Sequence, residues 1–376
     1  MEMKKNQMEN LGLSEWFLTE ASGYPGLFVG RVVSQHRDFY RVVTEEGECS
    51  AEISGKFRFQ VKKMTDFPAV GDFVLLDRKE NHFGNAIIHH VLTRKSAFIR
   101  KAAGTSNAVQ VVAANIDTVF LCMSLNRDFN LRRLERYLGI AWDSRAVPVI
   151  VLTKADLPGA NLQERLQDLE KVACGVDVVV TSSMTAEGDF PIRAYLGKGK
   201  TVAFIGSSGV GKSTLINRLL HREALPTGEI RSDDRGRHTT TRRDLLVLAD
   251  GGAVIDTPGM REIGIETADL DRAFSDIGEF AARCRFSDCT HTCEPGCSVQ
   301  QAIREGRLSA ERLSSYLKLK KESKYEGLNS RQIEAEKIEA MFAEVGGIKN
   351  ARKLAKAKNN RDFPETRGWG KKRHSR

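Results

Sequence analysis

Residues 201–214 read TVAFIGSSGVGKST, and this stretch decides the fold of the chain. Within it, GSSGVGKS matches the pattern G-x4-G-K-[ST], between an apolar segment typical of a buried strand and the helix-like segment STLINRLL. Glycines let successive backbone N–H groups turn toward one phosphate, and the positive end of the following helix adds to the attraction. Lys212 can reach the outer phosphates, and the Ser213 hydroxyl can ligate Mg²⁺. We expect nucleotide phosphates to contact Gly206, Ser207, Ser208, Gly209, Val210, Gly211, Lys212 and Ser213.

Two segments that follow this loop are typical of a nucleoside triphosphatase. The sequence AVIDTPG places Asp256 at the end of a strand, where its carboxylate can hold Mg²⁺, and Gly259 where its N–H can contact a γ-phosphate. The polar segment RSDDRGRHTTTRRD, which lies between the two motifs, has the composition of a mobile switch loop. One of its three consecutive threonines should reach Mg²⁺ and the γ-phosphate. We favour Thr240, although the spacing does not fix the register.

The base of the nucleotide is predicted to be guanine. In PVIVLTKAD a strand ends at Thr153-Lys154-Ala155-Asp156; the acid can accept hydrogen bonds from N1 and N2 of guanine while the lysine stem covers the base. Adenine lacks this donor edge, and each charge-assisted bond contributes about 1.5–3 kcal/mol. In VVVTSSMTAEG, a backbone N–H of Ser182 or Ser183 can bind the guanine O6. Alone, either motif also fits a surface loop, but the phosphate loop in the same chain favours the guanine interpretation.

The order of these motifs is inverted, because the base motifs precede the phosphate loop. A circular permutation of this kind retains the sheet when the former termini lie close together. Buried strands alternate with amphipathic helices, which predicts a parallel α/β sheet with helices on both faces over residues 100–270. The expected strands are 118–125, 147–152, 176–180, 201–205, 244–248 and 253–255, and the expected helices are 131–141, 162–173 and 213–220.

The chain before the α/β domain has a different pattern. Over residues 25–99, short alternating segments recur between turn signals, which predicts a small antiparallel barrel of the five-stranded OB type. Such barrels often bind nucleic acid, although barrel shape alone is weak evidence. Residues 1–24 are expected to be an N-terminal extension that forms a short polar helix or a frayed end.

A metal site is predicted after the α/β domain, at the start of a mostly helical domain over residues 271–348. Cys284, Cys289, His291 and Cys297 have the spacing C-x4-C-x-H-x5-C. Three thiolates and one imidazole complete a tetrahedral zinc shell with no position left for substrate, so we interpret the Zn²⁺ as structural. Cys293 is a fifth candidate ligand, and a disulfide pair is the competing interpretation.

The net charge of the chain is concentrated at its end. Residues 349–376 hold eleven Lys and Arg against two acids, which equals the formal charge of +9 for the whole chain of 376 residues. This segment lacks the apolar residues that build a core, so we expect a basic arm that contacts nucleic-acid phosphates, with Trp369 available to stack on a base. A solvated tail without function is the alternative.

Cysteine usage and hydropathy indicate the compartment. Seven cysteines, of which four crowd between 284 and 297, do not form a disulfide framework. The chain shows neither an apolar run of about 18 residues nor a secretion signal at its start. We therefore expect a cytoplasmic protein, monomeric and without a membrane partner.

Taken together, the permuted motifs, GRHTTT, DTPG, the Cys/His spacing and the preceding barrel resemble the bacterial ribosome small subunit-dependent GTPase A family over residues 25–320. The resemblance implies a factor that binds the 30S subunit and its 16S rRNA during late maturation and hydrolyses GTP under stimulation by that subunit. It also implies that the phosphate-binding residues extend to Thr214 and that His238 is the switch-loop histidine. Because Met260 stands where Ras-like enzymes place a water-orienting glutamine, His238 is our candidate for that role; contact with RNA or solvent is the alternative. Gly209 replaces the asparagine of potassium-activated relatives, which argues against potassium dependence.

These observations predict in-line attack of water on the γ-phosphate of GTP, with Lys212 and a Mg²⁺ held by Ser213, Thr240 and Asp256 stabilising the developing charge. Two other functions compete with this one. The first is an RNA-binding module whose nucleotide site regulates without hydrolysis. The second is a metal-inserting GTPase in which the Cys/His set transfers its metal.

Overall fold

The computed structural model describes residues 7–36, 39–80, 84–101, 109–126, 128–158, 161–182, 190–222, 224–225, 244–256, 270–292 and 294–324. Among these residues, no helix has the length and apolar character needed to cross a membrane. The predicted arm over 349–376 lies outside the described residues.

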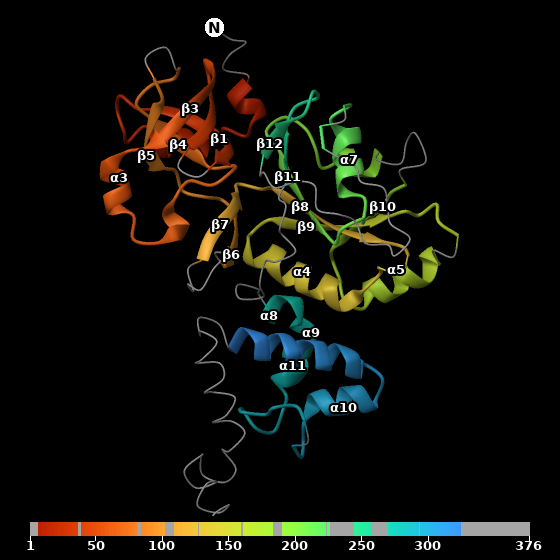
Figure 1. Cartoon of the computed structure of the whole chain (residues 1–376). Coiled ribbons are helices and arrows are strands. Elements are labelled where there is room, and N and C mark those ends of the chain that lie inside the picture. Colours follow the sequence, from red (N-terminus) through yellow and green to blue (C-terminus); the bar gives the residue numbers. More distant parts are fainter. Residues whose placement is uncertain are drawn as a thin grey trace, which may run out of the picture. The chain divides into compact units, whose positions relative to one another are not determined.

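The N-terminal barrel closes in the order β1-β2-β3-β5-β4, with β4 pairing back onto β1 (Figure 1). Its strands are β1 (Phe28–His36), β2 (Phe39–Thr44), β3 (Gly47–Ile53), β4 (Phe73–Leu76) and β5 (Ala86–Val91). This is the predicted five-stranded barrel. The expectation of a wholly antiparallel barrel was wrong for one pair, because β3 and β5 run parallel. The long crossover through α3 (Gly55–Gln60), η1 (Met64–Asp66) and β4 lets β5 return in the direction of β3.

The first described residues, from residue 7 onward, pack against the rest of the protein. Helix α2 (Glu15–Ala21) buries Phe17, and Met8 and Leu11 are also buried in the main hydrophobic core. The guanidinium of Arg31 in β1 donates to the carbonyl of Leu11, and also to the carbonyls of Gly71 and Asn115 at 3.2 Å each. Arg31 therefore ties the N-terminal segment to the barrel and to the strand that leads into the next domain.

The α/β domain forms a sheet in the order β10-β9-β8-β11-β13-β12. Its strands are β8 (Thr118–Ser124), β9 (Val147–Thr153), β10 (Asp177–Val180), β11 (Thr201–Gly206), β12 (Asp244–Val247) and β13 (Ala253–Asp256). All pair in parallel except β12 with β13, which is a departure from the predicted parallel sheet. The turn between these two strands is short, with Gly251 and Gly252 at φ of 91° and 85°, so the chain reverses and the pair is antiparallel.

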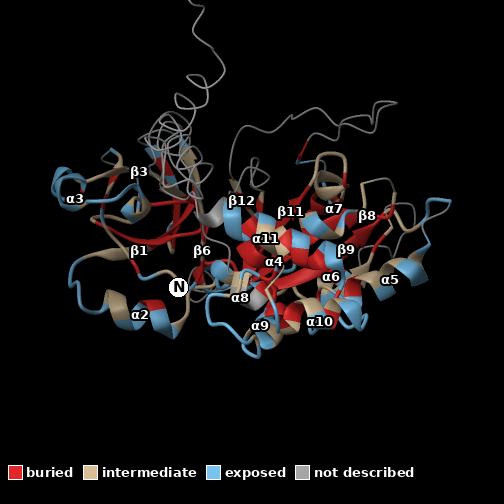
Figure 2. Cartoon of the chain, turned by 90° about the horizontal axis from the view of Figure 1, so that it is seen from below, coloured by how far each residue is buried: buried red, intermediate tan, exposed pale blue. Residues whose placement is uncertain are grey.

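Helices cover both faces of this sheet. They are α4 (Leu131–Asp143), α5 (Leu162–Glu170), α6 (Phe190–Arg193) and α7 (Lys212–Leu219). Figure 1 shows α4 and α5 on one side of the sheet and α7 on the other, and in Figure 2 the strands of this sheet are mostly coloured as buried. Side chains of β8 alternate between two cores because successive residues of a strand point to opposite faces. The core toward α4 holds Val119, Leu121, Leu134 and Leu138; the core toward α7 holds Phe120, Cys122, Leu215 and Ile216.

Two connections join the α/β domain to the barrel. A hairpin of β6 (Ala97–Lys101) and β7 (Val109–Ala114), which sequence analysis did not predict, leads from one to the other, and the predicted boundary at 99/100 falls inside β6. In addition, Asp244 of β12 pairs with Ser34 of β1, so the barrel and the α/β strands form one continuous sheet.

The part after the sheet is helical, with α8 (Leu270–Ala273), α9 (Ser275–Ala281), α10 (Ser298–Arg304) and α11 (Ala310–Lys324). A small core of its own includes Phe274, Ile277, Val299 and Leu313. This part contacts α4 through a buried ion pair between Arg312 and Glu135. For the described residues of the predicted range 271–348, the helical character agrees with the prediction.

Candidate functional site

The sequence motifs meet at one edge of the sheet, where parallel strands end. In register, Ser124 of β8 lies beside Thr153 of β9, Leu152 beside Val180 of β10, and Gly206 of β11 beside Cys122 of β8. Strand β13 ends at Asp256 on the same edge. The carboxyl ends of parallel strands are the usual ligand-binding edge of such sheets.

The phosphate loop turns tightly between β11 and α7. A Cβ on Gly206 would lie 2.6 Å from the carbonyl oxygen of Cys122, so no larger residue fits there. Gly209 and Gly211 adopt positive φ values of 74° and 105°, a region that favours glycine. The Lys212 ammonium donates to the carbonyls of Gly206 and Ser207 at 2.8 Å each, so the side chain curls over its own loop.

The base motif contacts this loop directly. The Thr153 hydroxyl donates to the carbonyl of Val210, across 57 residues of sequence, at 2.6 Å. The Ser182 hydroxyl donates to the Asp156 carboxylate at 2.6 Å, and Arg218 of α7 donates to the Ser182 carbonyl at 3.2 Å. Residues 153–156 and 206–213 therefore lie at one site despite their inverted order.

Asp256 has the properties of a cation ligand. Burial raises the pKa of its carboxyl to about 6, although nearby Lys212 lowers it, and Asp244 adds a further increase. The Oδ2 atom is buried and has no hydrogen-bond partner among the described residues. A buried carboxylate oxygen without a hydrogen-bond partner among the described residues, close to Lys212 of the phosphate loop, fits Mg²⁺, which prefers oxygen ligands.

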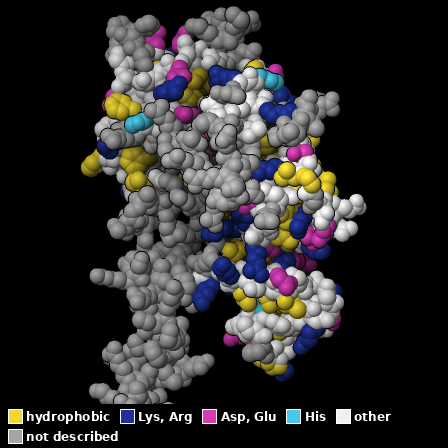
Figure 3. Space-filling view, turned by 45° about the vertical axis from the view of Figure 1, so that its right-hand side comes forward, with side chains coloured by type: hydrophobic (Ala, Val, Ile, Leu, Met, Phe, Trp, Pro, Cys, Tyr) yellow, Lys and Arg dark blue, Asp and Glu magenta, His cyan; other side chains and the backbone are white. Residues whose placement is uncertain are grey.

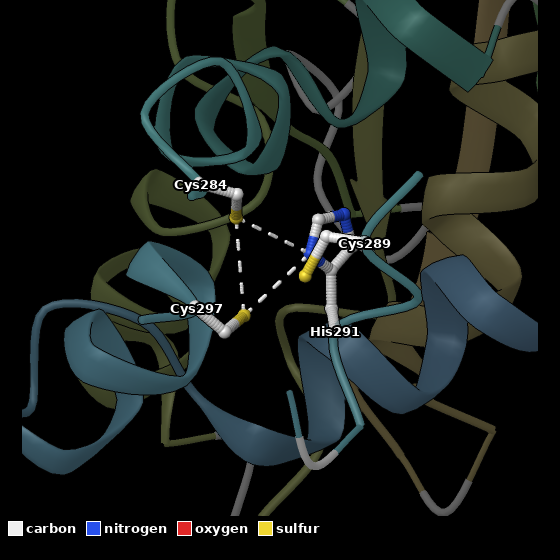
Figure 4. Close-up of side chains that lie close together, drawn as sticks. All are labelled: Cys284, Cys289, His291 and Cys297. Carbon is white, nitrogen blue, oxygen red and sulfur yellow. Dashed lines mark hydrogen bonds between the residues drawn. The ribbon is translucent and has the colours of Figure 1, made fainter. Parts of the chain in front are cut away.

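The predicted zinc ligands converge in the helical part. The side chains of Cys284, Cys289, His291 and Cys297 place their ligand atoms within 4.8 Å of one another (Figure 4). The Cys284 sulfur lies 3.9 Å from that of Cys297, and both lie near His291 Nδ1, at 3.6 and 3.7 Å. A tetrahedral Zn²⁺ site with Zn–S near 2.3 Å and Zn–N near 2.0 Å has edges of roughly 3.5–3.8 Å. The donor set and its spacing therefore fit zinc.

Local structure orients these ligands. Cys297 is the N-cap of α10, and its sulfur accepts from the backbone N–H of Gln300 at 3.4 Å. The Gln300 amide donates to the carbonyl of His291, which has a positive φ of 61°. Burial, followed by the charge of Lys320, lowers the pKa of His291, so the neutral imidazole that binds metals is favoured.

Comparisons with known proteins agree with this geometry. A protein-family model described as RsgA GTPase matches residues 91–266. A protein of Lactiplantibacillus plantarum named small ribosomal subunit biogenesis GTPase RsgA 2 is 50% identical over 338 residues, covering 90% of this chain and 94% of that protein. This chain belongs to the RsgA family. The resemblance inferred from the sequence motifs is thereby confirmed.

Other RsgA relatives extend the comparison. One from Methanosarcina acetivorans, named small ribosomal subunit biogenesis GTPase RsgA, is 42% identical and covers 86% of this chain and 88% of its own. The crystal structure of YjeQ from Thermotoga maritima aligns with a TM-score of 0.57 at 28% identity, over 79% of this chain and 98% of that one. The structure of YloQ, described as a circularly permuted GTPase, shares the fold, with a TM-score of 0.55 at 24% identity over 80% of this chain and 96% of that one.

Several predicted site residues of this RsgA family member lie outside the described residues, so their roles stay predictions. They are Ser183, His238, Thr240 and Gly259, together with the alternative ligand Cys293. The nucleotide motifs at 153–156, 206–213 and 256 fall inside the segment that the family model matches, whereas the Cys/His cluster follows its last residue.

One further side chain contacts the phosphate loop, and no sequence motif indicated it. The Asp128 carboxylate accepts a hydrogen bond from the hydroxyl of Ser207, the second residue of the loop. The only signal in the sequence was an acid in a polar turn directly after the buried strand β8, at the edge where ligands bind.

Proposed function

We propose that this chain hydrolyses GTP and acts in the biogenesis of the small ribosomal subunit. Membership of the RsgA family and the names of its relatives support the proposal. The structural observation that supports it is the hydrogen bond from Thr153 to the Val210 carbonyl, because it holds the proposed guanine motif next to the proposed phosphate loop.

The chain's own groups account for binding and positioning. Backbone N–H groups of the loop 206–213 surround the phosphates, and Asp156, oriented by Ser182, accepts from the guanine edge. Lys212 lies at the outer phosphates, where its charge stabilises the charge that develops during in-line attack of water. A Mg²⁺ held by Ser213, Asp256 and Thr240 supplies further neutralisation of phosphate charge when bound. His238 is the candidate that orients the attacking water.

Within the small subunit, the proposed binding partner is the 16S rRNA. The barrel, the helical part with the Cys/His cluster and the arm at 349–376 are the surfaces proposed to contact it. Figure 3 shows Lys and Arg side chains close together on one face, at the height of α4 and above the helical part. In the helical part, Arg285 lies over the ring of the exposed Phe286, with 5.6 Å from Cζ to the ring centroid. Exposed cations beside an aromatic ring suit phosphates and unpaired bases. We further propose that the protein is a cytoplasmic monomer with a structural zinc.

The proposal is tested by the rate of GTP hydrolysis measured alone and with added small subunits, large subunits or whole ribosomes. Slow hydrolysis alone and strong acceleration by small subunits are expected, because Met260 cannot orient water and the subunit would order the switch segment. If added small subunits leave the rate of GTP hydrolysis unchanged, the proposed activation by the small subunit is refuted. GTP binding with no turnover under any condition would favour the RNA-binding module with a regulatory nucleotide site.

A further inference from the structure

Asp128 lies between the phosphate loop and α4. One carboxylate oxygen accepts from the Ser207 hydroxyl, and the other pairs with Arg133 of α4 at 2.9 Å. Arg133 also donates to the backbone carbonyl of Asp128 at 2.5 Å. Because the Ser207 carbonyl accepts from Lys212, the residue that Asp128 contacts also helps to position the P-loop lysine.

The turn that carries Asp128 is fixed by its own hydrogen bonds. The Asn126 side chain accepts from the backbone N–H of Asp128 at 2.9 Å and from the Ser124 hydroxyl at 2.7 Å. Asn130 caps α4 by accepting from the backbone N–H of Arg133 at 3.0 Å. These bonds hold the backbone of Asp128 to Asn126 and fix the start of α4, so the carboxylate lies next to the phosphate loop.

Helix α4 also contacts the helical part of the chain, α8–α11, which carries the Cys/His cluster. Glu135 of α4 is only 3% exposed and accepts from Arg312 of α11 at 2.8 Å. Arg312 is 9% exposed and also pairs with Asp276 of α9, through bonds of 2.6 and 2.8 Å. Helix α9 ends at Ala281, three residues before the first metal ligand, Cys284.

We propose that Asp128 is a positioning residue for the phosphate loop and that α4 couples nucleotide binding to the zinc-binding part. Contact of phosphate with the loop changes the geometry of Ser207, the Asp128–Arg133 pair transmits the change to α4, and Glu135 transmits it to Arg312. The inference rests on the proposed binding of GTP at this loop. Since coupling is reciprocal, a nucleotide that stabilises the helical part through this route must bind less tightly once the link between Glu135 and Arg312 is weakened.

A double-mutant cycle on the full chain tests the proposal. Affinities for fluorescent GDP and for a non-hydrolysable GTP analogue are measured for the wild type, Asp128→Asn, Glu135→Gln and the double variant. The first substitution keeps the size of the side chain but removes the charge that pairs with Arg133. Each single change is expected to weaken affinity for the GTP analogue by roughly three- to tenfold, and the double change by clearly less than the product of the two.

The control is Asp168→Asn, because Asp168 is an acid on the neighbouring α5 that pairs with Lys171 at 3.1 Å and does not touch the loop. Its affinities should stay within about twofold of the wild type. Effects that multiply in the double variant, or unchanged affinity in Glu135→Gln, would overturn the coupling while leaving GTP binding by the wild type intact. Absence of GTP binding by the wild type would instead refute the proposed function.

Glu135→Gln could destabilise the helical part itself, which a loss of bound zinc would reveal. A second measurement tests the proposal without that variant. Hydrogen exchange of backbone amides in α9 and α11 is followed in the wild type and in Asp128→Asn, each with and without the GTP analogue at saturation. The analogue should slow exchange there in the wild type and have a weaker effect in the variant. Equal protection in both proteins would contradict a route through Asp128.

Discussion

At the scale of single residues, Asp256 is placed where function and stability oppose each other. Its carboxyl is largely buried at the end of β13, and burial raises its pKa to about 6 even though Lys212 is close. In an unfolded chain the pKa is about 3.9, so the folded state binds its proton more tightly. The resulting loss of stability is absent below about pH 4, grows as the pH rises toward 6 and is complete above that value.

Asp256→Asn should therefore raise the thermal stability of the protein measured without nucleotide or magnesium at pH 7.5, by on the order of 2 kcal/mol. The gain should shrink at pH 4.5, where the native carboxyl is mostly protonated. The same variant should lose magnesium-dependent GTP binding. Asp250→Asn, in the exposed turn before β13, is the matched control and should change neither property. A variant less stable than the wild type at pH 7.5 would contradict the argument.

Asp156→Asn should weaken GTP binding and improve binding of xanthosine triphosphate, because the amide can donate to the extra carbonyl of xanthine. Two charge-assisted bonds of about 1.5–3 kcal/mol each correspond to a loss of at least roughly 100-fold for GTP. Competition between the two nucleotides on the same protein measures the switch. GTP affinity equal to that of the wild type would exclude Asp156 from base recognition.

Residues in short motifs could be proposed from the sequence because their chemistry is local. The loop 206–213 and the base motif 153–156 each indicate their role within a few residues. Their supporting partners could not be found in this way: Ser207 meets Asp128 across 79 residues, and Arg312 meets Glu135 across 177. Local sequence patterns contain no information about such long-range pairs, because the partners meet only when the chain is folded.

At the scale of elements, the central strands of the α/β sheet were recognisable because both of their faces are buried, so each is a short continuous apolar run in the sequence. Most predicted strand ends agree within a residue or two, because buried strands with β-branched residues end where polar loop motifs begin. The direction of β12 and the β6–β7 hairpin were missed. Strand direction depends on a glycine turn of only a few residues, and short strands with mixed faces give a weak period-2 pattern.

Helix α3 of the barrel presents an aromatic ring that the core does not use. Ser54 caps the helix and Phe57 anchors it, while Phe59 is 92% exposed beside the exposed cation Arg58. Phe59→Ala should lower affinity for 16S rRNA by roughly 5- to 100-fold if the ring stacks on a base, without changing stability. Trp16→Ala on α2, an exposed aromatic that directly follows an acid, is the control. Equal RNA affinity for wild type and Phe59→Ala would exclude stacking there.

The Cys/His cluster should bind one zinc per chain and stabilise the small helical core. Cys289→Ser is expected to abolish that zinc and to unfold α9 and α10 at lower temperature, since structural zinc contributes on the order of 10 kcal/mol to such units. Metal analysis and circular dichroism measure both effects. Cys174→Ser changes an exposed cysteine that lies far from the cluster in the sequence, and this variant should retain the zinc. Retention of zinc by Cys289→Ser would point to another ligand, such as Cys293.

At the scale of the whole molecule, charge and fold are separated along the chain. The barrel, the α/β domain and the helical part together carry almost no net charge, whereas residues 349–376 account for all of it. Long-range attraction to nucleic acid should therefore depend on this segment, and close recognition on the folded surfaces.

Deletion of residues 349–376 should flatten the salt dependence of RNA binding. If about six of its charges meet phosphates, the affinity of the full chain falls by roughly 10³-fold between 50 and 200 mM salt, and the truncated chain should lose far less. Titrations of 16S rRNA at several salt concentrations give the two slopes. Identical slopes would mean that the segment is a bystander.

The pairing of Ser34 with Asp244 also has a consequence for how the molecule can be divided. Strand β12 is the last strand of the α/β sheet on that side, and its first residue, Asp244, pairs with β1 of the barrel. An uncovered strand offers unpaired N–H and C=O groups that invite edge-to-edge association. A nucleotide-binding fragment produced without its barrel would lose this pairing and expose the start of β12, so we expect the fragment to self-associate more readily than the full chain.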